Sequence, residues 1–248
     1  MPAGASKEHP APLVVLPHGG PWARDSWGFN PEVQFLASRG YAVFQPNYRG
    51  STGYTWRFPD EDQWAFRKMH DDVTDGVKAM LTTGVIDGDR IAIMGASFGG
   101  YLAIAGAVNE RNLYRCAITI AGVFDWEQVM KEAKGSEYSR AQYRILHRHL
   151  GNPKKNQEEF DEISPLKHID QIEIPVFVAH GVEDPIASVA QSKKLLAELK
   201  EYQIPHEQLI EADEGHGFRK LDHQVKLYTA SEAFLAKNLV VLTKAPAP

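Results

Sequence analysis

RIAIMGASFGG, residues 90–100, joins an apolar run to a serine surrounded by small residues. Glycine contributes no packing inside a buried strand and costs backbone entropy, so the glycines after this run indicate a tight turn. Residues 95–99, GASFG, fit the pattern G-x-S-x-G, with a predicted strand before them and a small-residue helix after them. Such a turn lifts the Ser97 hydroxyl to the carboxyl end of a sheet, at a helix N-terminus that favours developing negative charge.

A glycine-rich turn has a second interpretation, in which the serine caps a helix within a nucleotide-binding loop. Such a loop ends in Gly-Lys followed by Ser or Thr, or has a different glycine spacing, and neither feature is present. The pattern therefore favours a nucleophilic serine, for which Ser97 is the candidate. A serine hydroxyl is a weak nucleophile until a base removes its proton, so a histidine has to lie nearby in the fold.

Short apolar runs rich in β-branched residues alternate with helical patterns along the chain. Because the runs are apolar nearly throughout, they suit strands that are covered on both faces. They lie at 13–17, 41–47, 90–95, 116–122, 175–181 and 207–212. The helical patterns lie at 31–40, 71–84, 99–108, 188–202 and 225–239. This alternation predicts an α/β fold with a doubly wound, mostly parallel sheet.

Composition restricts the classes of protein to which the chain can belong. The 248 residues are 43% hydrophobic and 24% charged, as in a globular protein with one large core. A formal net charge of −5 gives no basic surface for nucleic acid, and no apolar run is long enough to span a bilayer. The N-terminus has no apolar signal region, and the single cysteine, Cys116, lies in a predicted buried strand. We therefore expect a cytoplasmic protein without nucleic-acid or membrane partners.

Two loops that follow predicted strands supply the partners that a serine nucleophile needs. His216 lies between two glycines in DEGHGF, directly after the last apolar run, and is the expected base. Asp184 follows the run at 175–181 and is the expected acid, with Glu183 as the alternative; it would fix the histidine tautomer and stabilise the imidazolium. The chain order of serine, acid and histidine is that of α/β hydrolases.

Other histidines do not indicate a metal. His147 and His149 lie in a charged helical stretch without a second cluster of ligands, so neither a metal nor a cofactor is expected.

Two segments interrupt the alternation of strands and helices: a long aromatic-rich connection at 48–70, and a helical excursion at 123–173. Long connections in a compact domain are usually functional or mobile, and we expect a substrate pocket to draw on residues 48–66 and 123–150 of these segments.

A developing oxyanion needs N–H donors, and two segments can supply them. One donor is the backbone N–H of Phe98, the residue after the candidate nucleophile. The other segment is the loop PHGGPW (17–22), directly after the first apolar run, whose glycines let backbone N–H groups turn toward the site. We expect Gly20 to be the donor here, with Gly19 as the second choice. An ordinary Pro/Gly turn is the alternative for this segment.

The chain resembles the catalytic domain of the prolyl oligopeptidase family of serine peptidases in five ordered segments: PHGGPWARDSW, NYRGSTGY, GASFGGY, HGVEDP and EGHGF. Within this family it is most similar to the branch of acylaminoacyl peptidases and dipeptidyl peptidases. The resemblance implies the α/β-hydrolase fold and cleavage of peptide bonds in short peptides through an acyl-enzyme, with Ser97, Asp184 and His216 as the triad. In parts of the family a tyrosine of the RGxxxY segment donates its hydroxyl to the oxyanion, and Tyr54 holds that position here.

The same resemblance implies parts for which this sequence has no counterpart. Family members usually carry an N-terminal β-propeller, and two edge strands normally precede the one expected at LVVLP (13–17). We therefore interpret 1–12 as a lead-in and 13–248 as the hydrolase domain, either excised from a longer protein or a natural short form. The strand YAVFQ (41–45) is then expected at a sheet edge that borders solvent or a partner chain, with a tendency to self-associate.

Three functions stay open on the sequence alone. The first is a serine peptidase acting on short peptides. The second is a serine carboxylesterase, because the same machinery cleaves esters. The third is a catalytically impaired domain whose pocket is misformed without the missing parts, since the geometry of a site depends on rigid neighbours.

Overall fold

The computed structural model describes residues 1–135 and 140–239. A six-stranded sheet in the order β2-β1-β3-β4-β5-β6 forms its centre, and all neighbouring strands are parallel. The strands are β1 (Ala11–Val15), β2 (Ala42–Phe44), β3 (Ile86–Ala96), β4 (Cys116–Ile120), β5 (Val176–Gly181) and β6 (His206–Glu211). The chain moves outward from β1 to β2 and then returns to the other side of β1, so the strand order reverses between β1 and β3.

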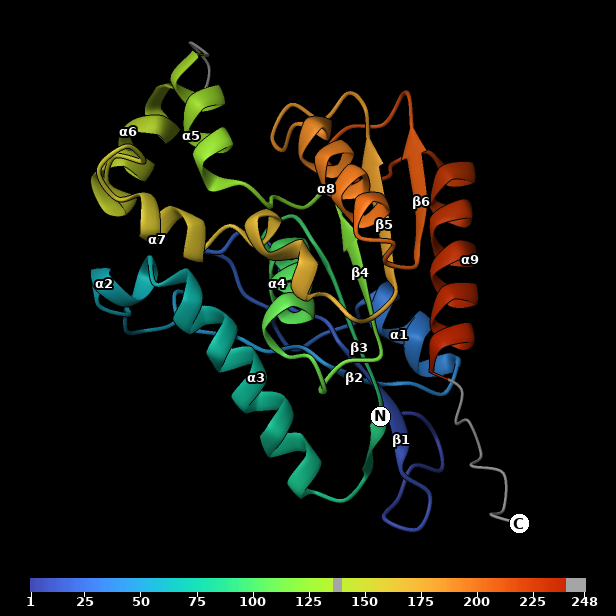
Figure 1. Ribbon diagram of the computed structural model, residues 1–248. Coiled ribbons are helices and arrows are strands. Elements are labelled where there is room, and N and C mark those ends of the chain that lie inside the picture. Colours follow the sequence, from blue (N-terminus) through green and yellow to red (C-terminus); the bar gives the residue numbers. More distant parts are fainter. Residues whose placement is uncertain (136–139, 240–248) are drawn as a thin grey trace.

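Helices cover both faces of the sheet (Figure 1). One face is covered by α3 (Phe66–Thr82), α4 (Phe98–Asn109) and α8 (Val189–Glu201), and the other by α1 (Pro31–Ser38) and α9 (Leu221–Asn238). Successive residues of β1 show the two layers: Leu13 and Val15 pack in one apolar cluster, and Val14 packs in the other. The doubly wound parallel sheet predicted from the sequence is confirmed.

The remaining helices belong to the two segments that interrupt the alternation. They are α2 (Asp60–Gln63), α5 (Trp126–Gly135), α6 (Arg140–Leu150), α7 (Gln157–Glu162) and the 3-10 helix η1 (Pro165–Gln171). Figure 1 shows α5 and α6 on the side toward which β5 and β6 point. Because the carboxyl ends of parallel strands form the usual ligand site of such sheets, these helices stand where a substrate would bind.

Most elements differ from the predicted boundaries by a few residues, and two of the differences have a clear physical cause. α3 begins at Phe66 rather than at 71, because Phe66, Met69 and Val73 form one buried stripe that continues the helix toward its N-terminus. β2 ends at Phe44 rather than at 47, since Pro46 has no N–H to donate to a sheet. None of the helices in the described ranges has both the length and the apolar character needed to cross a bilayer.

Candidate active site

Ser97 lies at the turn between β3 and α4, where its backbone adopts φ 57° and ψ −121°. Residues other than glycine rarely adopt this conformation, and here it is supported by a hydrogen bond from the Ser97 N–H to the Ile120 carbonyl oxygen at 2.8 Å. The flanking glycines are required by close approach of the backbone. A Cβ on Gly95 would overlap the Gly99 carbonyl, and a Cβ on Gly99 would overlap the Pro17 carbonyl oxygen.

The glycine loop 17–22 reaches the same point from the neighbouring strand. It follows β1, and Ser97 follows β3, so the two segments meet where the strand order reverses. Ligands of open α/β sheets bind in the crevice at this point. The approach is close: a Cβ added to Gly19 would lie 3.3 Å from Ser97 Cβ and 4.0 Å from its Oγ.

Asp184 and His216 come together from the loops after β5 and β6. His216 Nδ1 lies 2.7 Å from Asp184 Oδ2, and the Asp184 side chain is fully buried. Its Oδ1 accepts hydrogen bonds from the backbone N–H groups of Ile186 and Ala187 at 2.8 and 2.9 Å. Burial raises the pKa of Asp184, but hydrogen bonds from His180, His216 and the two amides outweigh burial and hold the pKa well below its usual range. An ionised carboxylate at this place orients the His216 ring, with Nδ1 as donor and Nε2 as acceptor.

His180 is a buried partner of the acid that sequence reasoning missed. Its Nε2 lies 3.2 Å from Asp184 Oδ2 and 2.9 Å from the Ala187 carbonyl oxygen, and its Nδ1 lies 2.7 Å from Ser192 Oγ. Both partners of Nε2 are acceptors, so Nε2 donates and Nδ1 accepts from the Ser192 hydroxyl. The available signal was its place in HGVEDP, at the end of β5 and four residues before the acid.

Ser97 is in the cavity beside this pair but is not bonded to it. Ser97 and Asp184 line one cavity, whereas no hydrogen bond joins Ser97 Oγ to His216 within residues 1–135 and 140–239. Catalytic hydrogen bonds are often long without substrate and shorten in the reacting complex. The structure therefore brings the acid and the histidine into contact, and the contact between the serine and the histidine stays a prediction.

His18 holds the loop that was predicted to supply an oxyanion donor. Its Nδ1 lies 2.7 Å from the Gly19 carbonyl oxygen, and its ring stacks on Tyr48 with 4.3 Å between centroids. Burial lowers the pKa of His18, and its Nδ1–H donates to this carbonyl oxygen. Carbonyl and N–H point in opposite directions across a trans peptide bond. With its carbonyl turned toward His18, the peptide directs the Gly20 N–H away from that ring, and Gly20 lines the cavity.

Of the other two predicted donors, Phe98 lines the cavity and Tyr54 is not among the described residues that line it. Phe98 is the first residue of α4, so its N–H has no partner within the helix, and Phe98 lines the cavity. Tyr54 is absent from the residues that line the cavity in the described part of the chain. Its ring stacks on Trp56, with 5.3 Å between centroids, and the Arg24 guanidinium lies 5.2 Å from its centroid. A role for the Tyr54 hydroxyl stays a prediction.

The cavity beside Ser97 has a volume of about 450 Å³. One wall is α5 and the residues before it, among them Val123, Trp126 and Val129, and the opposite wall is the loop after β5. Gln191 of α8 fixes the start of the first wall, because its Oε1 accepts from the N–H groups of residues 124 and 125, each at 2.9 Å. Apolar and polar groups contribute about equally to the walls, and Glu132 and Asp184 are the charged side chains among the described residues that line them.

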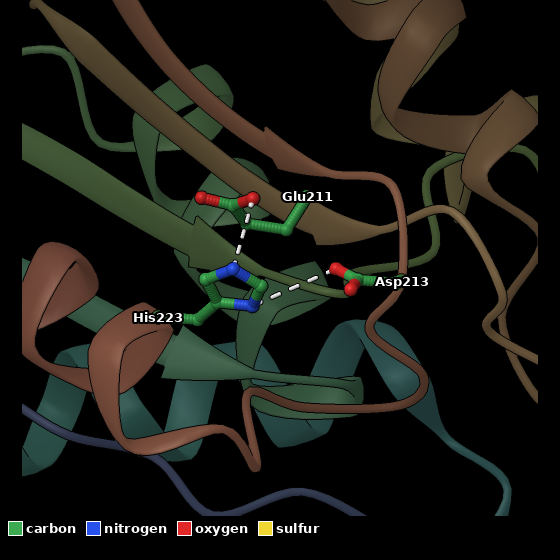
Figure 2. Close-up of side chains that lie close together, drawn as sticks. All are labelled: Glu211, Asp213 and His223. Atoms are coloured by element: carbon green, nitrogen blue, oxygen red, sulfur yellow. Dashed lines mark ion pairs between the residues drawn. The ribbon is translucent and has the colours of Figure 1, made fainter.

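Glu211, Asp213 and His223 lie close enough together to be considered as metal ligands (Figure 2). The two ion pairs drawn in Figure 2 end on different ring nitrogens, from Glu211 to Nε2 at 3.4 Å and from Asp213 to Nδ1 at 3.8 Å. A metal ion binds a histidine ring through one nitrogen. Glu211 and Asp213 form their contacts with different nitrogens of the His223 ring, so these contacts do not converge on one metal position. Lys226 also pairs with Glu211, and Lys220 with Asp213. These contacts fit an ion-pair network rather than a metal centre.

Comparison with known proteins agrees with this geometry. The model of the prolyl oligopeptidase family matches residues 27–241. Dipeptidyl aminopeptidase BIII of Pseudoxanthomonas mexicana is 36% identical over 93% of this chain and 34% of its own length. The acylamino-acid-releasing enzyme of Rattus norvegicus is 27% identical over 96% of this chain and 33% of its own length. The solved structure of a puromycin-hydrolysing peptidase of Mycobacterium tuberculosis is 29% identical and superimposes with a TM-score of 0.79, over 93% of this chain and 34% of that one.

A parallel sheet in this strand order, with a serine on a strained strand-to-helix turn, defines an α/β hydrolase. Since the family model matches most of the sequence, the chain belongs to the prolyl oligopeptidase family of serine peptidases. The chain spans about a third of the length of the curated relatives named above.

Proposed function

We propose that the chain is the catalytic domain of a serine peptidase that cleaves aminoacyl amide bonds in short peptides through an acyl-enzyme. Ser97 is the nucleophile, His216 the base and Asp184 the acid of this proposal. The observation that carries it is the contact of 2.7 Å between His216 and the buried Asp184, beside the cavity that Ser97 lines. Residues 13–248 form the hydrolase domain, and the excursion at 123–173 supplies one wall of its pocket.

The reaction proceeds in two half-reactions. Ser97 Oγ attacks the carbonyl carbon of the substrate while His216 Nε2 accepts the hydroxyl proton, and Asp184 stabilises the imidazolium. As the C–N bond breaks, His216 gives this proton to the leaving amine, and the acyl group stays on Ser97 as an ester. Water then attacks the ester, His216 accepts its proton and returns it to Ser97 Oγ, and the acid is released.

Backbone N–H groups stabilise the oxyanion of both tetrahedral intermediates. Phe98 and Gly20 supply the two donors of the proposal, because both line the cavity at the helix N-terminus and the glycine loop. Gly19 is the second choice in the loop, and the Tyr54 hydroxyl would add a further donor if the aromatic segment moved toward the cavity. Donors of this kind each contribute roughly 10²- to 10³-fold to kcat.

A fluorophosphonate probe tests the proposed nucleophile directly, because it reacts covalently with an activated serine. We expect the wild type to be labelled and Ser97→Ala not to be labelled. Ser188→Ala is the matched control, since Ser188 is another serine of the same cavity and its Oγ caps α8. Labelling of Ser97→Ala at the wild-type rate, or a folded wild type that is not labelled, would reject the proposed site. The second result would favour a catalytically impaired domain.

Matched substrates distinguish peptidase from esterase activity. The names of the relatives, a dipeptidyl aminopeptidase and an acylamino-acid-releasing enzyme, support a short peptide as substrate. Turnover of an aminoacyl anilide together with the ester of the same amino acid is expected. Cleavage of the ester alone would show a carboxylesterase and would refute the peptidase assignment.

A further inference from the structure

Glu214 lies directly before Gly215 and His216, and its carboxylate is buried, with 3% of the residue exposed. Oε2 accepts a hydrogen bond from the Arg219 N–H at 3.0 Å, and Oε1 accepts one from the Lys220 N–H at 2.9 Å. The carboxylate therefore joins the start of the loop that carries His216 to its end, where α9 begins. These backbone hydrogen bonds lower the pKa of Glu214 against the effect of burial, so the group is ionised at neutral pH.

Glu214 also joins this loop to the loop of the acid. Its backbone carbonyl oxygen accepts a hydrogen bond from the Glu183 N–H at 2.9 Å. A Cβ on Gly181 would overlap the same carbonyl, so the two loops are in direct backbone contact. The two loops of the proposed triad are thus joined at Glu183, directly before Asp184, and at Glu214, two residues before His216.

His223 of α9 holds the Glu214 carboxylate from the other side. Its Nδ1 lies 3.0 Å from Glu214 Oε1, and its Nε2 lies 3.4 Å from Glu211 Oε2. The residue is buried, with 7% exposed, and has a carboxylate beside each ring nitrogen. The outer carboxylates of this network are balanced by lysines, as Lys226 pairs with Glu211 and Lys220 with Asp213.

We propose that Glu214, held by His223, is a positioning residue that fixes the loop of His216 so that Nε2 reaches the nucleophile; this inference rests on the proposed function. The His216 ring itself has one hydrogen bond in the described part of the chain, to Asp184, and its side chain is 20% exposed. A single bond leaves the ring able to swing about it, so the backbone of the loop has to be fixed by other groups. A misplacement of about 1 Å at a reacting group costs on the order of a hundredfold in rate.

Glu214→Gln is the variant that tests this role. The amide keeps the shape of the side chain, but its NH₂ group replaces one acceptor and faces a backbone N–H. We expect kcat for a peptide anilide to fall on the order of tenfold to a hundredfold, with KM within about twofold, because substrate contacts are unchanged. Asp213→Asn is the matched control: it removes a negative charge one residue earlier, from a side chain that is 54% exposed and lies 3.8 Å from His223 Nδ1, farther than Glu214. It should keep wild-type kcat.

A proton resonance separates positioning from general destabilisation. The hydrogen bond between His216 and Asp184 gives a downfield imidazole N–H signal, assigned by its loss in His216→Ala. We expect this signal to broaden by exchange with solvent in Glu214→Gln at a temperature at which both wild type and Asp213→Asn retain it. Wild-type kcat in Glu214→Gln, or a raised KM with unchanged kcat, would overturn the proposal.

His223→Phe keeps the inference testable if Glu214→Gln does not fold. This change preserves a ring, removes the donor to Glu214 and leaves both loop amides bound to the carboxylate. A smaller loss of kcat, about threefold to tenfold, is expected with unchanged KM, and an unchanged kcat would reject the role of His223 and Glu214. Failure of the proposed function is a separate result: it shows as a wild type without fluorophosphonate labelling, whatever the behaviour of the variants.

Discussion

The fold keeps the carboxyl group of Asp184 in its ionised form. Its side chain is inaccessible to solvent, yet two histidines and two backbone amides hold its pKa below the usual range. Because the pKa of Asp184 is lower in the folded protein than in the unfolded chain, the unfolded chain binds more protons than the folded protein does as pH falls. The contribution of Asp184 to stability is therefore fully present above about pH 4, the ordinary aspartate range, and is lost as pH falls through its folded-state pKa.

Asp184→Asn should reveal this contribution in the free energy of unfolding. At pH 7 the variant is expected to be less stable than wild type, and the difference should narrow as pH is lowered below about 4. Urea unfolding at a series of pH values measures it. Asp170→Asn, at an exposed position, serves as the control and should follow the wild-type curve. If the free energy of unfolding changed with pH in the same way for the wild type and for Asp184→Asn across this range, the lowered pKa of Asp184 in the folded protein would be contradicted.

Elements were predictable where one local pattern decides them. The strand β3 and the turn at Ser97 follow from an apolar run that stops at glycines, and no other turn chemistry fits that sequence. Boundaries were less predictable, since they depend on tertiary contacts. The first turn of α3 carries charged residues beside Phe66, and only the burial of Phe66 in the folded protein places it in the helix.

The helix α5 forms the pocket wall of the proposed enzyme, and Val129 tests that role. Val129 is half-buried and lines the cavity on the same face of the helix as Trp126. In Val129→Trp the larger side chain should fill part of the cavity. KM for anilides with a large apolar side chain next to the scissile bond should rise about tenfold or more, against less than about twofold for alanine anilide.

Two comparisons make the result of Val129→Trp specific to the cavity. Lys131→Trp places the same side chain on an exposed position of α5 that does not line this cavity, and it should leave both KM values unchanged. Labelling of Val129→Trp by a small fluorophosphonate should keep the wild-type rate, because Ser97 and His216 are untouched. An equal rise of KM for both anilides would show that α5 does not form the side-chain pocket.

At the scale of the whole molecule, the sequence predicts which strands end at the site but not which polar groups support it. Ser97, Asp184 and His216 each follow a strand, so a parallel sheet alone brings them to one edge. His180 and Glu214 differ in that their roles arise from burial and from partners distant in the chain. The sequence places His180 four residues before Asp184, in HGVEDP, but its burial and its contact with Ser192 are set only after the layers have packed.

The sheet of the described residues ends at β2, whose outer edge carries no further strand there. β2 is short, and Val43 and Phe44 are half-buried, while Phe44 packs on Gly76 of α3. An unpaired edge offers backbone N–H and C=O groups to another chain, and a lysine on such an edge suppresses this pairing.

If the protein self-associates through the edge of β2, the sedimentation coefficient of the wild type should increase with protein concentration. Val43→Lys should shift the equilibrium toward monomer with an unchanged circular dichroism spectrum, whereas Val225→Lys, an exposed valine of α9, should not. A wild type that stays monomeric across the concentration range would refute the edge as an interface.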